Sequence, residues 1–190
     1  MFRTRSIFSL PDELLSEILA RVGACSLDDL LNAGLSCKLF NEIAFDKYVL
    51  RQASIEKIPA MPWHKNYSFL EKCRDSGNPE ALYKQGVVEF FSYSNLEAGV
   101  AYLDIAAKSG HLGASYILGV IFLCKDDGEE SNQKGMQHLD EVYRAKRLSE
   151  ESSWRELRIH NPGDRAVSMQ AIGDLALSIA NWRSCRIDHS

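Results

Sequence analysis

Apolar residues recur at helical spacing from residue 14 onward. The first stripe occupies positions i, i+1, i+4, i+5 and i+8 of one helical face: Leu14, Leu15, Ile18, Leu19 and Val22. Pro11 suits the first position of this helix, where its missing N–H has no helical partner. Asp12 and Glu13 follow in the first turn, where the helix dipole favours negative charge. The pattern predicts a helix that stops at Gly23.

Three further short helices are predicted before the first proline break. Ser26 is a candidate N-cap for the second helix, and Asp46 is predicted to open the fourth. The apolar positions of the second and third helices are Leu27, Leu30, Leu31 and Leu35, and then Leu39, Phe40, Ile43 and Ala44. Pro59 and Pro62 then interrupt the pattern, so residues 59–66 are predicted to form a linker.

Beyond this break the sequence repeats itself. Sliding residues 69–87 forward by 33 positions gives seven identities in nineteen pairs, where average composition gives roughly one by chance. The identical pairs are Leu70/Leu103, Ser76/Ser109, Gly77/Gly110, Ala81/Ala114, Tyr83/Tyr116, Gly86/Gly119 and Val87/Val120. A second similarity, at a shift of 36, places Gly135 opposite Gly99 and Leu139 opposite Leu103. Such periods are typical of stacked helix pairs, which predicts helices near 67–76, 79–91, 97–109, 112–124 and 132–147.

Small residues inside these helices indicate where two helices pack closely. Glycine in a helix costs about 1 kcal/mol relative to alanine, and the cost is tolerated where two backbones must approach. Tyrosines at matching positions are predicted to fill the space beside them. The predicted repeat-packing residues are Ala81, Tyr83, Gly86, Ala114, Tyr116 and Gly119. Ser76-Gly77 and Ser109-Gly110 are predicted to end one helix so that the next turns back.

Composition and charge argue against several classes of function. The 190 residues are 45% hydrophobic and 25% charged, which is typical of a soluble globular protein. A net charge of −4 gives no electrostatic reason to bind nucleic acid or an anionic membrane. The most continuous apolar run, residues 112–124, is too short to span a bilayer. We expect a reducing compartment, cytosol or nucleus, although Arg3 and Arg5 in an acid-free first decapeptide also fit a mitochondrial address.

Residues that could carry catalysis or bind a metal are scattered along the sequence. The five cysteines lie at positions 25, 37, 73, 124 and 185, without the close spacing of a zinc or redox pair. The sequence contains no phosphate-binding glycine loop, no nucleophile elbow and no H-E-x-x-H motif. The acidic run at residues 126–130 lacks the alternating acids of a calcium loop. We therefore predict no catalytic residue, no metal site and no cofactor.

The N-terminal helices also match a known pattern that begins L-P-x-E and ends near C-K-R-W. The matching positions are Leu10, Pro11, Glu13, Leu14, Ile18, Leu27, Leu30, Leu31, Cys37 and Lys38, with Phe40 in place of the usual tryptophan. Leu39 stands where arginine is common, and the loop Gly23–Ser26 is short. The segment resembles the F-box, a trihelical module that docks onto the Skp-type adaptor of a cullin–RING ubiquitin ligase.

The F-box resemblance implies a set of residues that bind the adaptor. Large apolar side chains carry most of the energy of such an interface. The implied adaptor-binding residues are Leu10, Pro11, Leu14, Ile18, Leu27, Leu30, Leu31, Cys37, Lys38 and Phe40. Spacing alone leaves open which of them face the adaptor and which face the core of the module itself.

Two elements in the repeated part match a second known pattern. They are A-L-Y-x-x-G at residues 81–86 and A-A-x-x-G-H at residues 106–111. Together they resemble the Sel-one-like repeat, a relative of the tetratricopeptide repeat. The second copy departs from it at Ser115, where leucine is usual.

Both resemblances together imply an all-α protein. An F-box is expected over residues 9–58, a linker over 59–66, and Sel-one-like repeats, as a short α-solenoid of antiparallel helix pairs, over 67–147. A polar turn region and a C-terminal capping helix, on which Ile172 to Trp182 form the apolar stripe, are expected over 148–190.

The layout resembles a group of plant F-box proteins, which implies a function. Such a chain is expected to be a non-catalytic, substrate-recruiting subunit of a Skp–cullin–F-box ubiquitin ligase. The F-box would bind the adaptor and, through it, the cullin, and the repeats would bind a target protein. Two alternatives stay open: a ligase-independent helical-repeat scaffold, and an enzyme of a class that these motifs do not identify.

Overall fold

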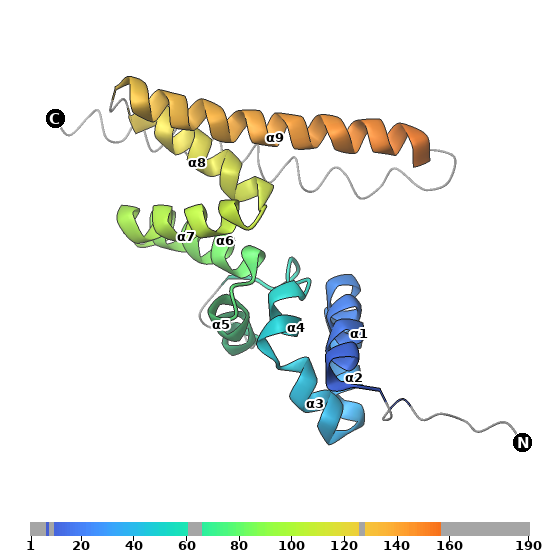
Figure 1. Cartoon of the computed structure of the whole chain (residues 1–190). Coiled ribbons are helices and arrows are strands. Elements are labelled where there is room, and N and C mark those ends of the chain that lie inside the picture. The colour runs from blue at the N-terminus through green and yellow to red at the C-terminus, as the bar shows by residue number, and fades with distance from the viewer. Residues whose placement is uncertain (1–6, 8–9, 61–65, 126–127, 157–190) are drawn as a thin grey trace, which may run out of the picture. The chain divides into compact units, whose positions relative to one another are not determined.

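The structure is a computed structural model that describes residue 7 and residues 10–60, 66–125 and 128–156, with side chains as far as residue 148. Every regular element in these ranges is helical (Figure 1), which confirms the predicted all-α class. The described residues up to Val142 belong to one compact unit, and those from Tyr143 onward belong to a second. The predicted capping helix that contains Ile172 and Trp182 lies outside the described residues.

Four short helices form the N-terminal part: α1 (Asp12–Cys25), α2 (Leu27–Ser36), α3 (Lys38–Ala44) and α4 (Lys47–Gln52). The side chain of Ser26 caps α2 by accepting a hydrogen bond from the Asp29 N–H at 3.2 Å. Asp46 caps α4 in the same way, through the Tyr48 N–H at 2.8 Å. Each cap satisfies a backbone donor that the first helical turn leaves without a partner.

The start and the end of α1 differ from the sequence prediction. Pro11 is the N-cap rather than the first helical residue. The predicted stop at Gly23 is wrong, because α1 continues to Cys25. Gly23 is buried inside the helix, where a Cβ atom would lie 2.8 Å from Cδ2 of Leu30. The glycine therefore allows α2 to approach α1 closely, and it does not end the helix.

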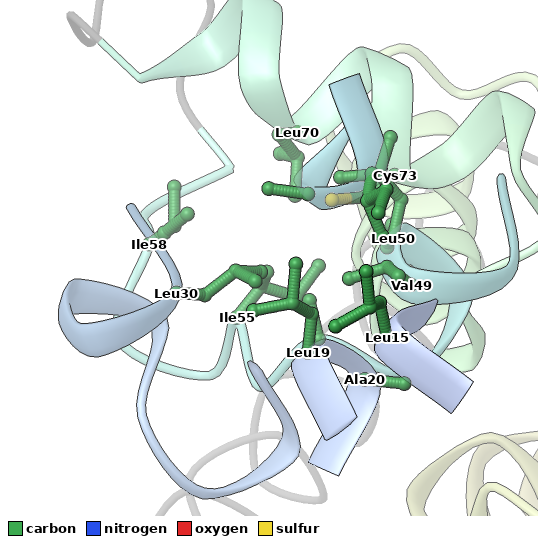
Figure 2. Packing of buried hydrophobic residues seen from close by; sticks show 14 residues of the cluster. Leu15, Leu19, Ala20, Leu30, Val49, Leu50, Ile55, Ile58, Leu70 and Cys73 are labelled. Carbon is green, nitrogen blue, oxygen red and sulfur yellow. The ribbon is translucent and has the colours of Figure 1, made fainter. Parts of the chain in front are cut away.

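The hydrophobic core of the N-terminal helices continues into the next two helices. Leu15, Leu19, Leu30 and Val49 occupy its centre, each at most 4% exposed (Figure 2). Leu70 and Cys73 of α5 (Tyr67–Asp75) and Ala81 of α6 (Pro79–Val87) belong to the same cluster. Burial raises the pKa of the Cys73 thiol to about 12, so this sulfur packs as an apolar group. One core thus spans both sides of the predicted linker.

Asn78 joins α4 to α6 at the centre of this region. Its side-chain nitrogen donates hydrogen bonds to the carbonyl oxygens of Leu50 and Ala53, each at 2.9 Å. Its side-chain oxygen accepts from the N–H groups of Glu80 and Ala81, at 3.1 and 3.2 Å. Both donors and both lone-pair positions of this amide are therefore used, although the residue is only 2% exposed. The amide therefore satisfies backbone groups at the C-terminal end of α4 and at the N-terminal end of α6.

Lys84 makes a second connection between the same two parts. Its ammonium group donates to the carbonyl oxygens of Ile55, Glu56 and Ile58 at 2.7 to 2.8 Å. An ammonium group has three N–H donors, so these carbonyls use all of them. Burial lowers the pKa of Lys84, and the carboxylate of Glu80, 3.4 Å from the ammonium, offsets part of that effect. The chain that leaves α4 is held against α6 by this lysine.

The repeated sequence forms the helices that follow: α6, a π-helical turn η2 (Val88–Ser92), α7 (Leu96–Lys108), α8 (Leu112–Lys125) and α9 (Glu129–Glu156). Gly77 and Gly110, with φ of +79° and +88°, follow α5 and α7 in the left-handed conformation that glycine adopts readily. The predicted Ser-Gly stops are therefore confirmed. α9 continues past residue 147, its predicted end, because no glycine or proline interrupts the chain there.

One helix crossing occurs twice in the repeat. A Cβ atom on Gly86 would lie 2.8 Å from Leu103 Cγ, and one on Gly119 would lie 2.8 Å from Leu139 Cγ. On the opposite helix of each crossing, a Cβ atom on Gly99 would meet Phe90, and a Cβ atom on Gly135 would meet Leu123. The four positions Gly119, Leu123, Gly135 and Leu139 follow Gly86, Phe90, Gly99 and Leu103 by 33 or 36 residues. The internal repeat in the sequence is therefore a repeat of one glycine-to-glycine packing geometry.

The amide of Asn78 gives a prediction for Asn78→Asp. Aspartate keeps the oxygen that caps α6, but it loses the donors to Leu50 and Ala53 and leaves two carbonyls without them. We expect a loss of about 2–4 kcal/mol in the free energy of unfolding, measured by urea denaturation. Asp46→Asn is the control, because Asp and Asn cap helices about equally well and Asp46 caps α4 by accepting from the Tyr48 N–H, which asparagine can also do. Equal stability of Asn78→Asp and the wild type would contradict the role of the amide.

The close crossing of α6 and α7 gives a prediction for Gly99→Ala. The added methyl carbon would lie 2.7 to 2.9 Å from Cβ, Cα and N of Phe90, and two of these are backbone atoms that cannot rotate away. We expect a destabilisation of about 2 kcal/mol, although alanine is the better helix former. Ala101→Gly, at an exposed site of the same helix, should cost about 1 kcal/mol from helix propensity alone. A melting temperature that rises in Gly99→Ala would overturn this account.

Candidate functional site

One face of α1 presents apolar side chains to solvent. Leu14 is 52% exposed and Ile18, one turn later, is 42% exposed. Leu15 and Leu19 of the same helix are 1% and 4% exposed, and Pro11 at the N-cap is also exposed. The stripe that the sequence predicts as one apolar face is therefore divided, with one pair in the core and one pair in water. Core packing does not account for the second pair.

Between the start of α2 and the end of α4, three large aromatic or aliphatic side chains outside the predicted site are exposed as well. Leu35 is 81% exposed, Phe45 38% and Tyr48 46%. In α2 the buried residues Leu30 and Gly34 are four positions apart, so they define the inward face of the helix. Leu35 lies about 100° away from Gly34 around the helix. Gly34, four positions after Leu30, was the sequence signal for the inward face of α2. Leu35 lies off that face, so this signal could have identified it as a surface residue.

The remaining predicted adaptor-binding residues divide by depth. Leu30 is 1% exposed and lies in the core, so its side chain is not available to a partner. The half-buried residues that pack on the core or lie beside it are Leu10, Leu27, Leu31 and Phe40. Of the ten predicted residues, only four have a largely exposed side chain: Pro11, Leu14, Ile18 and Lys38.

Cys37 and Lys38 have local roles at the start of α3. The sulfur of Cys37 accepts a hydrogen bond from the Phe40 N–H at 3.5 Å and so caps the helix. The side chain of Lys38 is 92% exposed, with its ammonium 3.8 Å from the carboxylate of Glu42. An exposed pair of this kind contributes little to stability, which leaves Lys38 available to a partner.

A polar group borders the exposed pair on α1. The Tyr48 hydroxyl of α4 donates a hydrogen bond to the carboxylate of Glu17, and Arg21 Nε donates to the same carboxylate at 2.8 Å. These two hydrogen bonds, that of Tyr48 first, lower the pKa of Glu17. Glu17 precedes Ile18, so α4 fixes the part of α1 that carries the exposed isoleucine.

The predicted repeat-packing residues are all buried or half-buried. Ala81 and Ala114 are at most 1% exposed, and Gly86 and Gly119 form the two crossings described above. Tyr116 is half-buried on α8. The ring of Tyr83 stacks on His111, with centroids 4.3 Å apart and planes inclined by 22°.

His111 connects the two repeats through its side chain. Its Nε2 lies 2.8 Å from Oε2 of Glu80, and its Nδ1 accepts a hydrogen bond from the Ala114 N–H at 3.1 Å. With Nδ1 as acceptor, Nε2 carries the proton and donates to Glu80. Burial alone would raise the pKa of Glu80, but the hydrogen bond from His111 and the charge of Lys84 outweigh it and the pKa is lowered. Histidine at this turn is therefore structural.

The described ranges contain no group of three or more His, Cys, Asp or Glu side chains that could hold a metal ion. Within the same ranges, none of the helices has both the length and the apolar character needed to cross a membrane. The arrangement offers apolar surfaces and a rigid helical array.

Comparison with known proteins agrees with this arrangement. The F-box-like family matches residues 7–56, and the plant tetratricopeptide repeat family matches residues 55–158. The description of the second family names tetratricopeptide repeats in general, which is compatible with the Sel-one-like form. No solved structure matches the chain significantly.

Curated relatives come from Arabidopsis thaliana. At1g67623, named as an F-box protein, is 40% identical over 135 residues, which cover 70% of this chain and 45% of the relative. The F-box protein At2g35280 is 32% identical over 124 residues, which cover 64% of this chain and 76% of the relative. This chain thus spans less than half the length of the first relative and three quarters of the second. These matches show that the chain belongs to the plant F-box proteins that carry tetratricopeptide-type repeats.

Proposed function

We propose that the chain is the substrate-recruiting subunit of a Skp–cullin–F-box ubiquitin ligase. F-box proteins generally act as substrate adaptors of such ligases, and membership of this family supports the proposal. The N-terminal helices bind a Skp-type adaptor and, through it, the cullin. The helical repeats bind a target protein. We propose the cytosol or the nucleus as the compartment, in line with the composition.

The observation that carries the proposal is the divided apolar stripe of α1. Leu14 and Ile18 are about half exposed while the neighbouring Leu15 and Leu19 are buried. Removing the exposed pair from water would contribute about 1–2 kcal/mol for each side chain. Buried apolar anchors of this size dominate the binding energy of many protein interfaces. A partner that covers α1 therefore gains most from these two residues.

The chain needs no reactive group of its own for this function. A receptor that binds a ligase and a target together raises the effective concentration of the target near the transfer site. The shared core, Asn78 and Lys84 keep α5 and α6 in a fixed position on the N-terminal helices. A target held by the repeats would therefore stay at a defined distance from the adaptor.

The double variant Leu14→Asp/Ile18→Asp tests the adaptor interface. Both side chains are exposed, so the substitutions should leave the helical content, measured by circular dichroism, unchanged. Two carboxylates against an apolar partner surface should weaken binding of a purified Skp-type adaptor at least tenfold, as isothermal titration calorimetry would measure; tenfold corresponds to about 1.4 kcal/mol. Ile105→Asp in α7 is the matched control, because Ile105 is 49% exposed and lies in the repeats.

Equal affinity of the wild type and the double variant would overturn the assignment of α1. An adaptor that binds neither protein would overturn the receptor proposal altogether and favour the ligase-independent scaffold.

A further inference from the structure

A hollow lies where the F-box helices meet the first helix after them. Its volume is about 300 Å³, and it is partly open to solvent; this volume is at the lower end of the range for ligand sites in proteins. Ile58, 4% exposed, lies at the edge of the core (Figure 2) and forms the floor of the hollow. The walls are Leu27 and Leu31 of α2, Phe45 after α3 and Phe69 of α5. Asn66, Ser68 and Lys72 complete the lining with polar groups.

The walls are held in place by contacts between these residues. The rings of Phe45 and Phe69 meet edge to face, with centroids 6.2 Å apart and planes inclined by 76°. Phe69 and Leu27 also pack on the common core, which fixes these two lining residues in place. Phe45, by contrast, remains 38% exposed, so the hollow opens to solvent at an aromatic ring. An apolar surface of this kind favours an apolar occupant.

The lining of the hollow also includes a cation, Lys72, whose side chain is exposed. The ammonium of Lys72 is 5.0 Å from the centroid of the Phe45 ring, a cation–π distance. No carboxylate of the described residues pairs with Lys72. Nearby Glu71 faces Arg74 instead, at 4.0 Å. Lys72 therefore places a positive charge, without a carboxylate partner among the described residues, beside the apolar side chains of the lining.

We infer that this hollow is a docking site for a short segment of the recruited target, in which a large apolar side chain is flanked by acidic residues. The apolar side chain enters between Leu31, Phe45 and Phe69, and a carboxylate of the segment pairs with Lys72. This inference deepens the proposed receptor function and rests on it.

The origin of the lining residues favours the target over the adaptor. The F-box-like match ends at residue 56, whereas Ile58, Phe69 and Lys72 lie beyond it. The hollow is therefore complete only when α5 packs on the F-box helices. A site built jointly with the repeat region is suited to a partner that is particular to this chain.

The test uses the full chain and two acetylated, amidated tripeptides, Asp-Phe-Asp and Asn-Phe-Asn. Amide chemical shifts from nuclear magnetic resonance, with assigned Leu31 and Phe69 signals, report binding during a titration to millimolar peptide. The acidic peptide should shift these signals and bind about two- to fivefold more tightly than the neutral one, the ratio expected for one exposed ion pair. Raising the salt concentration should reduce that ratio.

Three variants separate the parts of the site. Lys72→Glu should reverse the preference between the two peptides. Ser68→Trp, at an exposed position of the lining, should fill the hollow and abolish binding of both. Lys134→Glu makes the same change of charge on α9 and should leave both affinities unaltered.

Equal binding of the two peptides by the wild type, or no shift at Leu31 and Phe69, would overturn the inference. Displacement of the peptide by a Skp-type adaptor would also overturn it, because the adaptor would then occupy the hollow. Adaptor affinity that is unchanged in Lys72→Glu and Ser68→Trp supports the target assignment. These results are independent of the α1 double variant, so failure at the hollow and failure of the receptor function are distinguishable.

Discussion

The structure depends on one buried amide. Asn78 donates to the last carbonyls of α4 and caps the first turn of α6, so a single side chain satisfies four backbone groups from two parts of the chain. A buried polar group that lost these partners would be costly, and this makes the arrangement of the two helices specific. Lys84 acts in the same place by binding three carbonyls of the segment that follows α4. Together they determine how the repeats begin.

The F-box helices and the first helices of the repeat region share one hydrophobic core across the predicted domain boundary. The family matches overlap at residues 55 and 56, and the prolines of the sequence suggest a linker just beyond. The hydrophobic core nevertheless includes Leu70 and Cys73 of α5, so removal of the F-box helices would expose buried leucine and cysteine side chains. The F-box therefore also serves as the cap that an α-solenoid needs at its first repeat. Adaptor binding and target binding would then belong to one cooperative structure.

The repeat array shows how a few small residues define a geometry. Gly86 and Gly99 let α6 and α7 approach until a Cβ atom would not fit, and Gly119 and Gly135 do the same for α8 and α9. The stack of Tyr83 on His111 and the hydrogen bond from His111 to Glu80 then connect one repeat to the next. Because packing contacts in such an array are mainly between neighbours, local sequence carries most of the information. This is why the repeat was visible in the sequence at all.

The sequence by itself determined the all-α class, the helical repeat and the family, because these depend on spacing along the chain: apolar residues at helical intervals, and glycines that recur after 33 or 36 residues. Spacing did not distinguish Leu14 from Leu15, which differ by about 100° around the helix, or Leu30 from Leu35, which differ by about 140°. Only the tertiary structure decided which of them are buried, because that depends on where α2, α4 and α5 pack. The bonds from Asn78 to the end of α4 and from Lys84 to the segment after it also required the fold, since these partners lie 25 residues or more away in the chain. The hollow beside Phe45 required it too, because its lining combines residues of α2 and α5.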